Sequence, residues 1–150
     1  MESNNRGIEL PPDELPRKML SKLVKYEFEA LEQLLEQYSD RINDSVNDSG
    51  MSIFSTACSL NDDGSQAMRD KNLRMLNLIN RFNPSFDHQD KYQRSPLHNA
   101  TKSKNFTAIQ FLFEHGDKDK FIDLQSMGGV TALMNAAEQG VLSQVEFLLA

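Results

Sequence analysis

The 150-residue sequence contains no tryptophan and a single cysteine, Cys58. One cysteine cannot form a disulfide within the chain, and so low a content is typical of proteins from a reducing compartment. The sequence also lacks any apolar run of about 18 residues, the length that a membrane-spanning helix requires. Its first ten residues, M-E-S-N-N-R-G-I-E-L, have no apolar core of the kind found in a signal peptide. We therefore predict a cytoplasmic location and no membrane insertion within these residues.

Basic residues are fewer than acidic ones. The chain has 16 lysines and arginines against 22 aspartates and glutamates, which gives a formal net charge of −6. Proteins that bind nucleic acids or anionic membranes in general present a basic surface. The charge balance therefore argues against general nucleic-acid binding, although it is compatible with a local basic patch.

Motifs for phosphate or metal binding are missing as well. Neither G-x-x-x-x-G-K-[ST] nor G-x-G-x-x-G occurs, so the sequence predicts no phosphate-binding loop. His88 and His115 have no second histidine or carboxylate pair at ligand spacing, which argues against a zinc site. Residues 61–65, N-D-D-G-S, lack the alternating ligands and the closing glutamate of a calcium loop. We predict no metal and no cofactor.

Residues 94–116 carry the clearest pattern in the chain. Ser95 and Pro96 are typical of a helix start, Asn105 of a break between two helices, and Gly116 of a helix end. Between them, apolar residues recur at helical spacing: Leu97, Ala100, Ile109, Leu112 and Phe113. Two helices this short cannot bury their apolar face alone, so the pattern predicts neighbouring helix pairs of the same kind.

A family resemblance rests on the start of this segment. Residues 95–100, S-P-L-H-N-A, resemble the T-P-L-H-x-A signature of the ankyrin repeat, with Ser95 in place of threonine. Residues 131–136, T-A-L-M-N-A, are similar to the same signature, and residues 52–57, S-I-F-S-T-A, are a more distant copy. Residues 26–38 resemble the outer helix of an N-terminal capping repeat, in which Tyr26 stands where glycine is usual.

The resemblance implies an all-α ankyrin-repeat solenoid of stacked helix-turn-helix units joined by short β-turn fingers. We expect about four repeats, at residues 16–49, 50–92, 93–128 and 129–150, with the last one incomplete, preceded by a flexible acidic tail at residues 1–14. The second repeat is about ten residues longer than the usual period. We place the surplus in a polar inserted loop at residues 61–70, followed by an outer helix from Asn72 to Phe82.

Cys58, His98 and Asp90 are the residue types of a thiol-nucleophile site. The resemblance instead implies that His98 is a hydrogen-bonding residue at a helix start, tied to the neighbouring turns. It places Cys58 where a buried alanine is usual, and a buried thiol is unreactive. We therefore predict that this segment has no catalytic activity.

For function, the resemblance implies a protein-binding module whose partner docks on the concave face, formed by the fingers and by exposed positions of the inner helices. Tyr92 and Arg94 are the foremost candidates, because tyrosine and arginine are frequent interface anchors. The full set of candidate partner-binding residues is Met51, Thr56, Ser59, Tyr92, Arg94, Asn99, Lys102, Met127, Val130, Asn135 and Glu138.

Two interpretations of such a module stay open. The chain is either a scaffold or adaptor in its own right, or the regulatory N-terminal domain of a larger ion channel or multidomain enzyme. In either case Val145, Phe147 and Leu148 belong to the outer helix of the last repeat. We expect the apolar end of this repeat to be covered by further repeats or by another chain.

Overall fold

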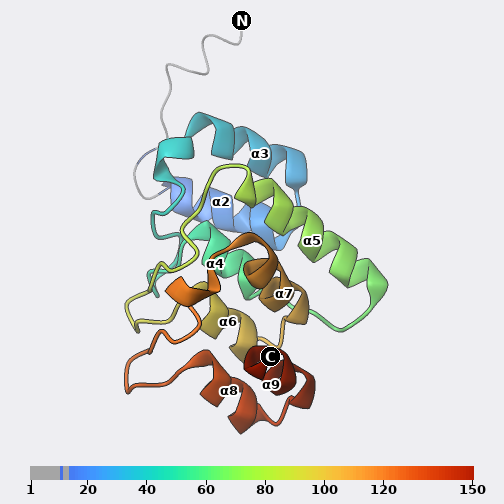
Figure 1. Ribbon diagram of the computed structural model, residues 1–150. Coiled ribbons are helices and arrows are strands. Elements are labelled where there is room, and N and C mark those ends of the chain that lie inside the picture. Colours follow the sequence, from blue (N-terminus) through green and yellow to red (C-terminus); the bar gives the residue numbers. More distant parts are fainter. Residues whose placement is uncertain (1–10, 12–13) are drawn as a thin grey trace, which may run out of the picture.

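The computed structural model describes residue 11 and residues 14–150, so the predicted tail lies almost wholly outside the described part of the chain. Eight α-helices and two short 3₁₀ turns form the regular structure of these residues, which include no strand. The helices come in pairs, and the pairs are stacked from the first to the last in chain order (Figure 1). The prediction of an all-α fold of stacked helix pairs is confirmed.

The pairs build two layers. The first helix of each pair lies in one layer: α2 (Glu14–Val24), α4 (Ile53–Cys58), α6 (Pro96–Lys102) and α8 (Ala132–Gln139). The second helices form the other layer: α3 (Phe28–Gln37), α5 (Gln66–Asn80), α7 (Phe106–His115) and α9 (Leu142–Leu149). Each helix of the first layer packs against its own partner and against the first helix of the adjacent pair. The long connections between pairs run along one side of the stack (Figure 1).

The core lies between the two layers and is filled by large apolar side chains. Leu97, Ile109 and Leu112 are fully buried, as their helical spacing predicted. Phe54 of α4 stacks on Phe86 of the following connection, with 4.6 Å between ring centroids. Burial of these side chains removes apolar surface from water, which is the main driving force for stacking the pairs.

Local residues set most of the helix boundaries. Ser52, Ser95 and Thr131 precede α4, α6 and α8, and each side-chain oxygen accepts a hydrogen bond from the backbone N–H three residues later, at 3.1–3.3 Å. Asn105 caps α7 in the same way, at 3.0 Å. These bonds satisfy backbone donors that have no partner inside the helix. Gly116 ends α7, and a β-carbon there would collide with the Phe86 ring.

The predicted inserted loop at residues 61–70 is wrong in its second half. Helix α5 begins at Gln66 instead of Asn72, after Ser65, whose hydroxyl accepts a hydrogen bond from the Met68 N–H. The segment that follows Ser65, Q-A-M-R-D-K, consists mainly of residues with a high helix propensity. The extra residues therefore lengthen the helix and leave only a short loop between α4 and α5.

The start of α5 is anchored to the first pair. Asn72 of α5 is fully buried, and its Oδ1 accepts a hydrogen bond from the Tyr26 hydroxyl at 2.7 Å. Tyr26 itself adopts a left-handed backbone conformation, with φ of 56°. Glycine adopts this conformation without strain, and glycine is usual at this position in the family that the sequence resembles.

The last helix pair leaves a set of apolar side chains exposed. Leu142 and Leu149 of α9 are each 67% exposed, and Met134 of α8 is 54% exposed. In contrast, the equivalent surfaces of α4 and α6 are covered by the pair that follows. The covering of this last face stays a prediction.

We predict that Leu112→Ala lowers the free energy of unfolding by about 2–5 kcal/mol, because it opens a cavity between the two layers. Leu142→Ala removes the same atoms from a side chain that is 67% exposed, so it should change the free energy little. Urea denaturation of both variants and the parent chain tests this. Equal losses in the two variants would contradict the burial described for α7.

Candidate functional site

Three tight turns connect the successive helix pairs next to the starts of α4, α6 and α8. We call them finger 1 (residues 46–51), finger 2 (residues 90–94) and finger 3 (residues 126–130). In each, the N–H of the first residue donates a hydrogen bond to the carbonyl of the last, at 2.8, 3.0 and 2.8 Å. Each finger is therefore closed by a hydrogen bond between its two ends, although finger 1 has six residues and fingers 2 and 3 have five.

The residue before the last in each finger adopts a left-handed conformation. Gly50, Gln93 and Gly129 have φ values of 81°, 62° and 78°. A side chain in this conformation costs about 1–2 kcal/mol, which glycine avoids. Gln93 is therefore a strained residue at the tip of finger 2, held in place by the hydrogen bonds around it.

Backbone hydrogen bonds join neighbouring fingers. The N–H of Lys91 donates to the carbonyl of Ser49 at 3.0 Å, and the N–H of Met127 donates to the carbonyl of Tyr92 at 2.9 Å. These two bonds occupy the same register in each finger. As a result, the tips lie side by side, with residue 127 next to residue 92.

Asp90 organises finger 2 from inside. Its Oδ1 accepts hydrogen bonds from the N–H groups of Tyr92 and Arg94, both at 2.9 Å, and its Oδ2 accepts one from Arg94 Nε at 3.0 Å. Asn47 does the same in finger 1, where its Oδ1 accepts from the N–H groups of Ser49 and Met51. The sequence predicted no structural role for Asp90, although an alignment of residues 47–51 with residues 90–94 places Asn47 and Asp90 at the same position.

His98 links α6 to finger 3, as the sequence predicted. The N–H of Ser95 donates to Nδ1 of His98 at 3.1 Å, and Nε2 of His98 donates to the carbonyl of Val130 at 2.8 Å. This pattern requires the neutral imidazole with its proton on Nε2. His98 is 1% exposed, and burial lowers its pKa despite the opposing effects of the Val130 carbonyl and Asp90.

Cys58 is fully buried, and burial raises its pKa. A protonated, inaccessible thiol is neither a nucleophile nor a metal ligand. Among residues 14–150 there is also no group of three or more His, Cys, Asp or Glu side chains that could hold a metal ion.

Six of the predicted partner-binding residues line one surface hollow between fingers 2 and 3 and helices α6 and α8. The hollow has a volume of about 340 Å³. Its lining residues are Tyr92, Arg94, Lys102, Ser126, Met127, Val130 and Asn135, of which the sequence analysis missed only Ser126. Tyr92 and Met127 are 43% and 60% exposed. The structure thus brings an aromatic ring, a thioether and two cations to one place.

Three of the predicted residues are not exposed, and their assignment to the surface was wrong. Met51, Thr56 and Asn99 are buried, with exposed fractions of 8%, 8% and 4%. Thr56 and Asn99 lie on α4 and α6, and each of these short helices is covered by first-layer helices on both sides. Met51 turns inward, where its sulfur accepts a hydrogen bond from Nδ2 of Asn47.

The two other predicted residues do not line the hollow. Ser59 follows α4, is half-buried, and donates a hydrogen bond to the carbonyl of Thr56. Glu138 lies on α8 and is exposed. The candidate site therefore narrows from a face that spans three fingers to the junction of fingers 2 and 3.

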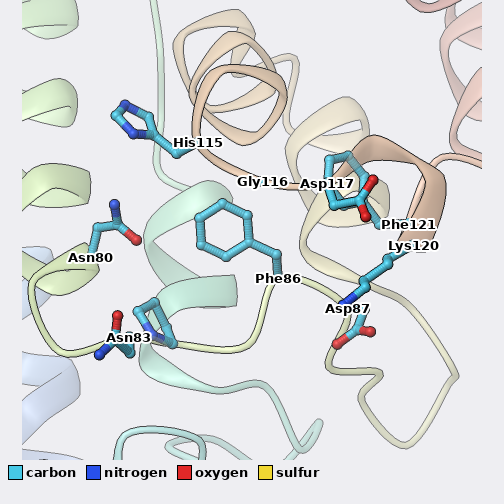
Figure 2. Close-up of a pocket in the computed structure, with 10 residues that line it drawn as sticks. Asn80, Asn83, Phe86, Asp87, His115, Gly116, Asp117, Lys120 and Phe121 are labelled. Atoms are coloured by element: carbon cyan, nitrogen blue, oxygen red, sulfur yellow. The ribbon is translucent and has the colours of Figure 1, made fainter.

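A second hollow, of about 330 Å³, lies where α5 and α7 end (Figure 2). Its lining includes Phe86, His115, Lys120 and the carboxylates Asp87 and Asp117, together with Asn80, Asn83, Pro84, Gly116 and Phe121. In Figure 2 the side chains of Asp87, Asp117 and Lys120 lie on one side of the Phe86 ring, and His115 lies on the other. Because groups of both signs are mixed there, this hollow favours no one class of ligand.

Comparison with known proteins gives one result. A family model described as ankyrin repeats, in three copies, matches residues 65–150. This stretch is more than half of the chain, and it contains helices α5 to α9 and every residue that lines the hollow between fingers 2 and 3. A search of curated proteins finds no match. Within the described residues, every helix is too short or too polar to cross a membrane.

We predict that Asp90→Ala destabilises the chain by about 2–4 kcal/mol, because it leaves three donors around a buried position without their acceptor. Asp90→Asn should cost about half as much, since Asn47 supports finger 1 with an amide oxygen. Thermal and urea unfolding of both variants measures this. If the alanine variant is as stable as the parent chain, Asp90 does not organise finger 2.

The lowered pKa of His98 predicts a pH dependence. Below about pH 6.5 the unfolded chain takes up a proton on this residue while the folded chain still excludes it. Stability should therefore be complete above that pH and fall as the pH drops towards the lower pKa of the folded chain. In His98→Gln the slope of unfolding free energy against pH in this range should be smaller. Identical slopes in urea titrations of the two proteins would contradict the assignment of a buried neutral imidazole.

Proposed function

The chain belongs to the ankyrin-repeat family, and on that premise we propose that it binds a protein partner in the hollow between fingers 2 and 3. Ankyrin-repeat domains are generally protein-binding modules and typically carry no catalytic activity. The observation that supports this location most is the pair of exposed side chains, Tyr92 and Met127, that line one hollow. Large apolar groups on a surface commonly mark sites of interaction.

The two side chains suit the role of anchors. The N–H of Met127 donates to the carbonyl of Tyr92, so the residues that carry them are neighbours across the fingers. Tyrosine offers a large, rigid contact surface, and methionine adapts to the shape of a partner. Arg94 and Lys102 add charged groups at the edge of the same hollow. Such a combination of apolar centre and polar rim is characteristic of protein interfaces.

The site is also preorganised. Fingers 2 and 3 are joined through their backbones, and His98 fixes finger 3 to α6. Few rotatable bonds of the fingers become ordered when a partner docks here, so the chain loses less conformational entropy on binding. We propose that this docking takes place in the cytoplasm, a compartment that suits a chain with one buried, reduced cysteine.

A second proposal concerns the context of the domain. The exposed Met134, Leu142 and Leu149 of the last pair support its packing against further repeats or against another chain. The domain would then act as the recognition part of a larger scaffold, or as the regulatory part of a channel or multidomain enzyme.

A random peptide library displayed on phage provides a probe for the hollow. We predict that peptides selected on the chain bind the Tyr92→Ala/Met127→Ala variant about tenfold more weakly or worse, since the variant removes both anchors. Fluorescence anisotropy with labelled synthetic copies of the peptides measures the affinity. Arg94 is left in place because its Nε bonds to Asp90, and its replacement would disturb finger 2.

Val24→Ala/Leu73→Ala is the matched control, because these side chains are also exposed, at 51% and 36%, but lie on α2 and α5 away from the hollow. This control should bind the peptides as the parent chain does. Equal affinity of the parent chain and the Tyr92/Met127 variant would contradict the proposed site.

A further inference from the structure

The charged side chains that line the hollow differ from those of the chain as a whole. The chain has a formal net charge of −6, yet the residues that line the hollow include two cations and no carboxylate. Lys102 is exposed and forms no ion pair within residues 14–150. Arg94 pairs with the buried Asp90 through Nε alone, which leaves the far end of its guanidinium for a ligand.

The apolar part of the hollow has a defined orientation. The Arg94 guanidinium lies 4.8 Å and the Lys91 ammonium 5.5 Å from the centroid of the Tyr92 ring. These cation–π contacts restrain the ring beside the exposed side chain of Met127. A ligand can therefore place an apolar side chain against Tyr92 and Met127 while a neighbouring oxygen meets Arg94 or Lys102.

From these features we propose that the hollow binds an extended acidic peptide segment, whose carboxylates pair with Arg94 and Lys102 and whose apolar side chain packs on Tyr92 and Met127. This inference rests on the proposed function and specifies the chemistry of its partner. Carboxylates are favoured over the phosphates of a nucleic acid, because the chain as a whole is acidic, with a formal net charge of −6, whereas nucleic-acid binding requires an extended basic surface. An acidic peptide requires complementary charges only at the hollow itself.

The test begins with the sequences that the phage library yields. Peptides selected on the parent chain should be enriched in aspartate and glutamate relative to the unselected library, and should carry at least one large apolar residue. Selection on Lys102→Glu should lose the acidic excess. This variant should fold, because Lys102 is exposed and its side chain forms no ion pair in the described structure; circular dichroism and a melting curve verify it.

The affinities of the synthetic peptides provide the second readout. Lys102→Gln should weaken binding about fivefold, the effect of a single exposed ion pair at the upper end of its usual range. Lys118→Gln, an equal change of charge at an exposed residue that does not line the hollow, should have no effect. Raising the salt from about 0.05 to about 0.5 M should weaken binding to the parent chain and affect Lys102→Gln less.

The outcomes separate the inference from the proposed function. Peptides without an acidic excess that still depend on Tyr92 and Met127 would overturn the inference and leave the proposed function standing. Peptides that bind Tyr92→Ala/Met127→Ala and Lys102→Gln with the same affinity as the parent chain would overturn the inference and the proposed function. A library from which no peptide is enriched would also overturn the two. A single-stranded oligothymidylate that binds as tightly as the selected peptides would overturn the choice of an acidic peptide.

Discussion

The hydrogen bond from Nε2 of His98 to the carbonyl of Val130 joins the two sides of the candidate site. Tyr92, Arg94 and Lys102 lie on one side, and finger 3 with α8 lies on the other. At the equivalent position α4 has Ser55, whose buried hydroxyl oxygen has no partner in the described structure, and α8 has the exposed Met134. Of α4, α6 and α8, only α6 has at this position a side chain that bonds to the next finger in the part of the chain that the structure describes. This bond holds the two sides of the hollow together where fingers 2 and 3 meet.

The electrostatics of the site follow from a buried carboxylate. Asp90 uses both oxygens on finger 2, where it accepts from two backbone N–H groups and from Arg94. Its negative charge is thereby held beneath the surface, while the guanidinium of Arg94 reaches the hollow and contacts the Tyr92 ring. The same interaction that shapes the turn also orients the cation and the aromatic ring. The shape of finger 2 and the surface proposed for recognition thus both depend on Asp90, which lies outside the lining of the hollow.

The sequence predicted those features that single residues determine locally. Ser95, Asn105 and Gly116 fix helix ends through their own caps and conformations, so the third pair was located correctly. The prediction of a loop at residues 66–70 is wrong, because the surplus residues of this repeat have a high helix propensity and lengthen α5. The burial of Thr56 and Asn99 depends on the helices that pack against α4 and α6 from both sides. The spacing of residues within one repeat does not predict this packing. The structural role of Asp90 could not be predicted, because two of its three hydrogen-bond donors are backbone N–H groups.

We propose that a partner binds at the junction of fingers 2 and 3. Backbone amide chemical shifts of the chain, recorded by NMR with and without a peptide selected on it, locate the binding surface residue by residue. We expect the largest changes at Tyr92, Arg94, Met127 and Val130, with smaller ones along the first turns of α6 and α8. Changes concentrated instead at the ends of α5 and α7, around the hollow of Figure 2, would contradict the account.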